Sequence, residues 1–250
     1  MNITAVVARK GGVGKTSTAV AIADAIAAAG KSVLLIDFDD QGNVALALGS
    51  EPGDAAFLFV VLDAFQPTVS RAYEAGGLWL LASNDRLRLG EIDTQTKGIA
   101  PLVAKLKTIA GFEHVVIDTK AGTSLALAAA KAADVIIVPT QPEALSVDGV
   151  FQQMAALDMA GATGERFVLP TMVDMQTRTH RAGMKMLNDH FPGSVLTSVP
   201  DRAAIRWAQE HGLLPSEVRN DPGIKDVVSA YRQAANLILA IESEKGQVYA

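Results

Sequence analysis

Residues 6–30 read VVARKGGVGKTSTAVAIADAIAAAG, which is a short apolar run, a glycine-rich loop and an alanine-rich run of helical length. Glycines in such a loop let backbone N–H groups close around phosphate oxygens, and the N-terminus of the following helix adds a positive charge. Lys15 is expected to reach the β- and γ-phosphates of ATP, and the Thr16 hydroxyl to ligate Mg²⁺. A plain glycine-rich turn is the alternative. The order of strand, glycines, Gly-Lys-Thr and helix favours a nucleotide site made of Gly11, Gly12, Val13, Gly14, Lys15, Thr16 and Ser17.

Further apolar runs alternate with alanine-rich segments along the rest of the chain. The runs at 3–8, 32–37, 114–119 and 134–140 predict buried strands, and those at 78–83, 166–173 and 194–199 are weaker candidates. Helices are expected at 15–29, about 54–66, 99–110, 123–133, 144–161, 178–191, 202–211 and 224–243. This alternation predicts an α/β fold, a doubly wound and mostly parallel sheet with helices on both faces, of the P-loop NTPase type. Residues 1–250 are expected to form a single domain.

The composition excludes several classes of protein. The chain of 250 residues has no cysteine, which excludes disulfides and cysteine-ligated iron–sulfur clusters. The N-terminus does not resemble a secretory signal, and no apolar run reaches the 18 or so residues that cross a bilayer, so a cytoplasmic protein with no membrane partner is expected. The net charge is −5, yet residues 176–232 hold eight Lys/Arg against six Asp/Glu. The four histidines have no metal-ligand spacing and are expected at the surface or at helix ends.

Carboxylates follow two of the predicted strands. Asp37, Asp39 and Asp40 come at the end of the run VLLID and just after it, and Asp118 closes the run HVVID. Because ligands of such sheets bind beyond the carboxyl ends of the strands, these side chains are expected to face the phosphate loop. A carboxylate that ends an apolar strand needs a partner, since burying it alone is costly. Acids of a surface turn are the alternative for the first three.

The segment KGGVGKT resembles the deviant Walker A motif of the ParA/MinD ATPases, with Lys10 at the position of their signature lysine and Arg9 in place of the motif's first glycine. The resemblance implies that Lys10 crosses a nucleotide-sandwich homodimer and touches the partner's nucleotide. A second cation on the phosphates would stabilise charge in the transition state, so that both active sites would depend on dimerisation. A solvated loop lysine is the alternative.

Two acidic segments extend the resemblance. VLLIDFDDQGN is similar to the family's D-x-D-P-Q-G-N, which implies that Asp39 orients the attacking water and that Asp37 lies nearer the metal, with Asp40 in place of proline. HVVIDT resembles a Walker B strand, which implies that Asp118 holds Mg²⁺ through water. The family usually continues D-x-P-P, whereas Lys120 and Ala121 stand here. Lys120 lies either near the γ-phosphate or in solvent.

The resemblance covers nearly the whole chain, although residues 51–100 are uninformative, and it points to the short ParA type without a helix-turn-helix extension. VIIVPTQPEALSVDG, LPTMVDMQTRT and VPDRAAIRWAQEHG are similar to later family segments. The resemblance implies a slow ATPase whose ATP-bound dimer binds DNA nonspecifically on the nucleoid and is released when a ParB-like or adaptor protein stimulates hydrolysis, for plasmid or chromosome partition. The candidate DNA contacts, for which ordinary helix-surface charge is the alternative, are Arg202, Arg206, Arg219 and Lys225.

Three alternatives remain at this point. The chain could position another intracellular cargo. A MinD-like membrane switch would need a basic amphipathic C-terminal helix, whereas this chain ends AANLILAIESEKGQVYA. A metabolic ATP-dependent ligase of the same fold would show turnover that depends on a small substrate and not on a partner protein. An electron carrier like nitrogenase reductase is excluded because the chain has no cysteine.

Overall fold

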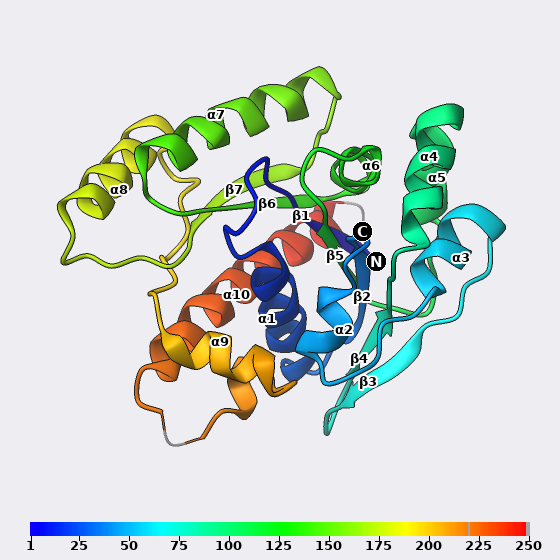
Figure 1. Cartoon of the computed structure of the whole chain (residues 1–250), viewed down its shortest axis with the longest axis horizontal. Helices are drawn as coiled ribbons and strands as arrows, with labels where there is room; N and C mark the ends of the chain where they lie inside the picture. The colour runs from blue at the N-terminus through cyan, green and yellow to red at the C-terminus, as the bar shows by residue number, and fades with distance from the viewer. Residues whose placement is uncertain (220, 249–250) are drawn as a thin grey trace.

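A seven-stranded sheet forms the centre of the protein in a computed structural model that describes residues 1–219 and 221–248 (Figure 1). The strands lie in the order β3-β4-β2-β5-β1-β6-β7. All neighbouring strands are parallel except β3 and β4. The strands are β1 (Asn2–Val6), β2 (Ser32–Phe38), β3 (Thr68–Ala72), β4 (Gly77–Leu81), β5 (His114–Thr119), β6 (Val135–Thr140) and β7 (Glu165–Pro170).

Helices cover both faces of this sheet. One face packs against α1 (Lys15–Ala28), α2 (Asn43–Ala47), α9 (Ala203–Glu210) and α10 (Ile224–Val248), and a short 3-10 turn, η1 (Pro215–Glu217), precedes α10. The other face packs against α3 (Ala55–Leu62), α4 (Leu87–Lys97), α5 (Ala100–Lys107), α6 (Ser124–Ala132), α7 (Ala144–Met159) and α8 (Arg178–His190). Figure 1 shows α1 beside α10, with α7 and α8 across the sheet from them.

Alternate residues of each central strand supply the two apolar cores. In β2, Val33 and Leu35 belong to the core under α1 and α10, whereas Leu34 and Ile36 belong to the core under α3 to α8. A strand that is apolar on both faces is typical of a parallel sheet covered by helices on both sides. The predicted α/β, doubly wound fold is therefore confirmed.

The chain reverses its winding direction next to β1, which lies between β5 and β6. In open sheets of this kind, ligands bind at such a switch point, beyond the carboxyl ends of the strands. The register places Asp37 of β2 directly opposite Asp118 of β5. Two of the predicted site residues thus lie side by side at this end of the sheet.

Both edges of the sheet differ from the sequence-based prediction. Within residues 51–100, the helix expected at about 54–66 and the weaker strand candidate at 78–83 correspond to α3 and β4, whereas α4 and β3 were not predicted. Strand β3 pairs with β4 as an antiparallel hairpin whose register shifts between Val69 and Arg71. The strand predicted at 194–199 is wrong. That segment forms only isolated bridges, Val168 with Val195 and Val173 with Pro200, because Pro170, which faces it from β7, has no N–H with which to extend a ladder.

The predicted surface position of His114 is also wrong. His114 opens β5 and is fully buried, with its backbone paired to β1 on one side and β2 on the other. Its Nε2 lies 2.8 Å from Glu242 of α10. Burial lowers the pKa of His114 in spite of that neighbouring carboxylate. The other three histidines lie in the first turn of α8 or at helix C-termini, as expected.

Candidate functional site

The loop between β1 and α1 has the shape of an anion cradle. Gly12 and Gly14 adopt φ angles of 75° and 82°, a left-handed backbone that favours glycine. Gly14 precedes α1, so the first N–H groups of that helix point out of the loop. A Cβ atom built on Gly11 or Gly12 would meet no heavy atom within 4 Å, which leaves open space in front of the loop. The loop is anchored from behind, since the Thr171 hydroxyl donates to the Val13 carbonyl over 2.8 Å.

A cleft of about 860 Å³ opens in front of this loop. Lys15, Thr16 and Ser17 line it at the start of α1, and Asp39 lines it from the loop after β2. A triphosphate chain in contact with the loop amides would therefore extend toward Asp39. The cleft residues are Gly11, Gly12, Gly14, Lys15, Thr16, Ser17, Asp39, Asn43, Leu46, Ala47, Lys120, Ala121, Met172, Gln209 and Glu210.

A narrower recess continues the cleft on the far side of Gly14 and Ser17. Its walls include the apolar parts of Met172, Val199 and Ile205. Gln209 donates a hydrogen bond of 2.6 Å to the Ser17 hydroxyl, which connects α9 to the phosphate loop. Sequence reasoning missed Gln209 and Met172 because no local motif marks them.

Two buried carboxylates lie behind Thr16. The Thr16 hydroxyl donates to Asp118 Oδ2 over 2.7 Å, and Asp37 lies opposite Asp118 in the sheet. Burial raises the pKa of Asp37, reinforced by the charge of Asp118. Burial also raises the pKa of Asp118 to about 7, against the hydrogen bond from Thr16. Burial of two acids side by side costs free energy, and such a cost is expected at a site where a bound cation would neutralise them.

The donor set fits Mg²⁺. Hydroxyl and carboxylate oxygens are its preferred protein ligands, and it usually keeps several waters and binds one or two carboxylates together with substrate phosphates. Within the described part of the chain no three His, Cys, Asp or Glu side chains converge as an all-protein metal cage. The geometry at Thr16, Asp37 and Asp118 therefore suits a metal held jointly with a nucleotide.

The loop after β2 is held in one conformation by its own polar groups. The Asp39 N–H donates to Asp37 Oδ1 over 2.9 Å, and the Asp39 carbonyl accepts a short hydrogen bond from Ser83. The Asp39 carboxylate is half-buried in the cleft, and this burial raises its pKa against the opposing hydrogen bond from the Gln41 N–H and the charge of Lys120. Asp39 is thus a fixed acceptor that faces the cleft.

Lys120, whose position the sequence left open, lies in the cleft wall and also binds Asp40. Its ammonium group is 2.6 Å from Asp40 Oδ1, while the Arg88 guanidinium is 2.6 Å from Asp40 Oδ2. Burial alone would raise the pKa of the Asp40 carboxyl, but the bonds from Lys120 and Arg88 hold it well below the ordinary value. Arg88 comes from α4, a helix that the sequence did not predict.

Lys10 lies outside the cleft. Its ammonium group donates to the Ser146 hydroxyl over 2.8 Å and lies 3.7 Å from Glu143, both at the start of α7. The ammonium group of Lys10 is therefore directed to α7 and not into the cleft of its own chain, although the residue directly precedes Gly11.

The four candidate DNA contacts lie along α9, the start of α10 and the segment between them, among acids. Arg206 pairs with Asp201 at 3.0 Å, and Arg202 lies 3.6 Å from Asp226. Arg219 and Lys225 are exposed. The predicted basic segment thus has two of its cations partly neutralised by neighbouring carboxylates.

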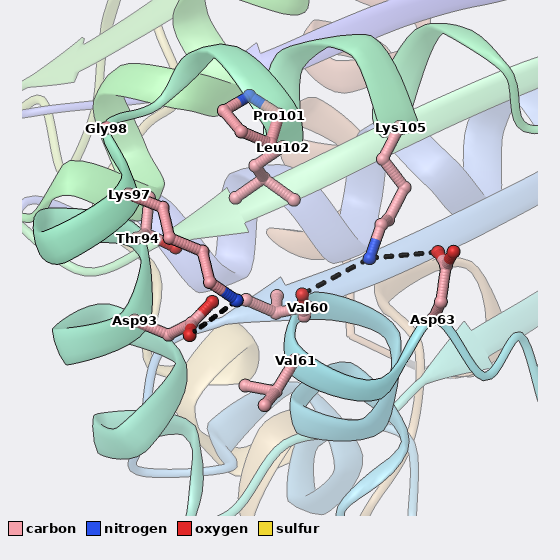
Figure 2. Close-up of a pocket in the computed structure, with 10 residues that line it drawn as sticks. All are labelled: Val60, Val61, Asp63, Asp93, Thr94, Lys97, Gly98, Pro101, Leu102 and Lys105. Atoms are coloured by element: carbon pink, nitrogen blue, oxygen red, sulfur yellow. Dashed lines mark hydrogen bonds and ion pairs between the residues drawn. The ribbon is translucent and has the colours of Figure 1, made fainter.

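A second hollow, of about 180 Å³, lies between α3, α4 and α5 (Figure 2). Figure 2 shows Lys105 and Asp63 pointing toward each other, 2.9 Å apart, and Lys97 beside Asp93 at 2.8 Å. Lys105 also donates to the Phe59 and Val60 carbonyls at the end of α3. These charges are satisfied within the fold, so we assign this hollow a structural role.

The chain is similar in sequence and in fold to known proteins. The family model described as an AAA domain matches residues 1–165. The chromosome partitioning protein ParA of Caulobacter vibrioides (strain NA1000 / CB15N) is 30% identical over 216 residues, which cover 81% of each chain.

Two solved structures share the fold. McdA of Cyanothece, in a complex with ATP, superposes with a TM-score of 0.81 at 23% identity and covers 96% of each chain. Cobyrinic acid a,c-diamide synthase from Mycobacterium smegmatis, with a bound ATP analogue and magnesium, has a TM-score of 0.74 at 28% identity and covers 96% of this chain and 94% of its own. In the described residues, no helix combines the length and apolar character needed to cross a membrane.

Proposed function

Because this chain belongs to the ParA/MinD family of P-loop ATPases, we propose that it is a Mg²⁺-dependent, slow ATP-driven switch of the partition type. One observation carries the proposal. The phosphate loop, the Thr16–Asp118 hydrogen bond and the Asp39 carboxylate meet at one cleft at the switch point of the sheet. This arrangement provides positions for the phosphates, the metal and the attacking water.

Each residue of the cleft has a distinct task in this proposal. The amides of residues 11–17 and the Lys15 ammonium would hold the phosphates, while Thr16, Asp37 and Asp118 would hold Mg²⁺. When bound, the metal neutralises charge that develops on the transferred phosphoryl group. Asp39 accepts a hydrogen bond from the water that attacks the γ-phosphate and thereby orients it. Its backbone is fixed by Asp37 and Ser83, so little ordering is left for the reaction itself.

Dimerisation is the second part of the proposal. Lys10 contacts the start of α7 and not its own cleft, which supports a role for its ammonium group in a second copy's active site. ATP would then be hydrolysed only in a homodimer, in which each copy supplies a cation to the other.

DNA binding and a partner protein complete the proposal. We propose that residues 1–250 act as one ATPase domain, that the ATP-bound dimer binds DNA nonspecifically in the cytoplasm through α9 and the start of α10, and that a ParB-like or adaptor protein stimulates hydrolysis and release. The match to the Caulobacter ParA supports partition of a plasmid or chromosome as the purpose. Two copies double the number of cations, so ATP would control DNA affinity through dimerisation.

A second candidate is a metabolic ATP-dependent ligase. The 28% identity to the cobyrinic acid a,c-diamide synthase structure favours it, since that likeness extends over nearly the whole chain. The two candidates differ in what stimulates ATP turnover. DNA and a partner protein would stimulate the partition switch, whereas a small carboxylic acid with an amine donor would stimulate the ligase.

The deciding experiment measures DNA binding of the native protein with ATP, with ADP and without nucleotide, in a series of salt concentrations. We expect binding only with ATP, with no sequence preference and a modest negative slope of log affinity against log salt. ATP binding without DNA binding in any of the three states at low salt would contradict the partition function and leave the ATPase assignment standing.

A further inference from the structure

Lys120 and Asp40 form an ion pair at two positions where the resembled family motifs have proline. Asp40 follows Asp39 in the loop after β2, and Lys120 follows Thr119 at the end of β5. Their charged groups are 2.6 Å apart, although 80 residues separate them in the chain. The Lys120 N–H also donates to the Phe38 carbonyl over 3.2 Å. The loops that carry Asp39 and Asp118 are therefore joined by two bonds, both made by Lys120.

The two ends of this ion pair differ in their surroundings. Only 6% of the Asp40 side chain is exposed, whereas 42% of the Lys120 side chain is exposed and lines the phosphate cleft. A buried carboxylate without a partner is costly, but an ammonium group at a cleft wall is easily hydrated or paired elsewhere. Lys120 is thus the member of the pair whose charge can leave at the lower cost.

Arg88 makes departure of Lys120 inexpensive. Its guanidinium stays 2.6 Å from the second oxygen of Asp40, and the Gln41 side chain donates to the first oxygen over 3.2 Å. If Lys120 leaves, the Asp40 carboxylate therefore keeps a cation and a hydrogen-bond donor. Arg88 is itself held in place by α4, whose Glu91 accepts hydrogen bonds from the Ser124 and Leu125 N–H groups at the start of α6.

A nucleotide bound in the cleft would supply a second anion with which Lys120 could pair. Lys120 and Ala121 line the same cleft as Lys15, Thr16 and Asp39, and the charge of Lys120 acts on the Asp39 carboxylate. A γ-phosphate in contact with the loop would bring two negative charges into this space, which ADP would not. Asp40 and the terminal phosphate would then compete for the ammonium group of Lys120.

We propose that Lys120 is a sensor of the γ-phosphate, which exchanges its ammonium group between Asp40 in the nucleotide-free protein and the terminal phosphate of bound ATP. This inference rests on the proposed ATPase function and deepens it. Exchange breaks the side-chain link between the loops of Asp39 and Asp118 only when ATP is present. The Arg88–Asp40 pair remains in both states.

The test compares affinities for ADP and for an ATP analogue with a non-hydrolysable β–γ bridge, at the same Mg²⁺ concentration, by calorimetric titration. Lys120→Gln should weaken binding of the analogue by about tenfold or more and leave ADP affinity unchanged. Asp40→Asn should have the opposite effect and raise the ratio of analogue to ADP affinity, because Lys120 is released from its competitor. Lys120→Arg should restore most of the preference, and Lys131→Gln, which removes an exposed lysine of α6, should change nothing.

The double variant Asp40→Asn/Lys120→Gln separates sensing from a structural role. If the exchange is correct, the double variant behaves like Lys120→Gln alone, since the Asp40 substitution acts only through Lys120. An equal loss of ADP and analogue affinity in Lys120→Gln, or an Asp40→Asn effect that persists without Lys120, would overturn the inference. If the native chain binds neither ADP nor the ATP analogue, the proposed ATPase function fails together with the inference. If the native chain binds both nucleotides and only the variants differ from expectation, the inference alone fails.

Discussion

The ammonium group of Lys10 lies 2.8 Å from the Ser146 hydroxyl, so the lysine beside the phosphate loop contacts α7 and not its own cleft. Ser146 is buried, whereas 43% of the Lys10 side chain is exposed. One hydrogen bond and a partly exposed ion pair hold a lysine only weakly, because solvent screens the charges. Lys10 is therefore restrained but available to a second molecule.

Lys10→Ala should separate nucleotide binding from assembly. The amides of the loop and Lys15 remain, so we expect monomer affinity for ATP to change by less than about threefold, while ATP-dependent dimerisation and hydrolysis are lost together. Light scattering and phosphate release measure the two effects. Arg9→Ala, at the exposed neighbouring position, is the control and should behave like the native chain. If Lys10→Ala still forms an ATP-dependent dimer and hydrolyses ATP at the native rate, Lys10 does not act in the active site of the second copy.

Lys15→Ala should abolish most nucleotide affinity. The variant removes a charge-assisted contact with the phosphates, which corresponds to a loss of roughly one hundredfold or more in affinity for ATP. Calorimetric titration in the presence of Mg²⁺ is the measurement, with Lys107→Ala, an exposed lysine of α5, as the control. Unchanged ATP binding would show that the phosphate loop is not part of the nucleotide site.

Asp39→Ala should bind ATP and dimerise but hydrolyse it at least about one hundredfold more slowly, because a positioned general-base or water-orienting group contributes on that order. ATP-bound dimer should then accumulate in light scattering. Asp40→Ala is a poor substitute for this test, since it leaves two cations without their shared carboxylate. If Asp39→Ala turns over ATP at the native rate, another group orients the water.

Asp201→Asn should strengthen DNA binding by the ATP-bound form. The substitution frees Arg206 from a carboxylate 3.0 Å away and adds one positive charge per subunit to the surface of α9. The salt dependence should steepen by up to about 0.9 per additional phosphate contact. Lys225→Glu should weaken binding equally on all sequences, with ATP affinity unchanged. Fluorescence anisotropy over a salt series measures both, and no effect from either variant would place the DNA surface elsewhere.

Between pH 3.8 and about 7, a lower pH should stabilise the nucleotide-free protein against unfolding. The pKa of Asp118 is raised from 3.8 to about 7 by burial, so between these values the folded protein holds a proton that the unfolded chain has released. Stability therefore falls as the pH rises through this window, and Asp37, whose pKa is also raised by burial and by the charge of Asp118, contributes in the same direction. Thermal unfolding in EDTA at pH 6, 7 and 8 measures this.

Asp118→Asn is the control for that pH dependence. His114 contributes in the opposite direction, since its lowered pKa makes its protonation at low pH unfavourable to the folded state. Subtracting the profile of Asp118→Asn removes this contribution. Identical profiles for the variant and the native chain would show that Asp118 does not titrate in this range.

The central sheet and the residues at its carboxyl ends could be predicted because both depend on local patterns. A run that is apolar on both faces predicts a buried parallel strand, and the ends of parallel strands meet at one edge. Asp37 and Asp118 therefore lie together in the structure as the strand ends required. Gly12 and Gly14 adopt the left-handed backbone that a phosphate loop needs.

Arg88 and His114 could not be predicted, for two different physical reasons. Arg88 belongs to α4, a helix with few apolar residues, and its role depends on Asp40, which lies 48 positions away in the chain. His114 is a polar residue at the start of a strand, where sequence alone favours the surface. Only the packing of β5 between β1 and β2, with α10 above it, buries the ring.

The two irregular edges of the sheet restrict how copies of this chain can aggregate. At one edge, the register shift between Val69 and Arg71 interrupts the row of N–H and C=O groups of β3, and Arg71 turns to Glu217 and the Gly212 carbonyl. At the other edge, the Val168 N–H and C=O are already taken by Ser194 and Leu196. Neither edge offers a regular template on which a foreign strand could add, which disfavours fibre growth by sheet extension even at high local concentration.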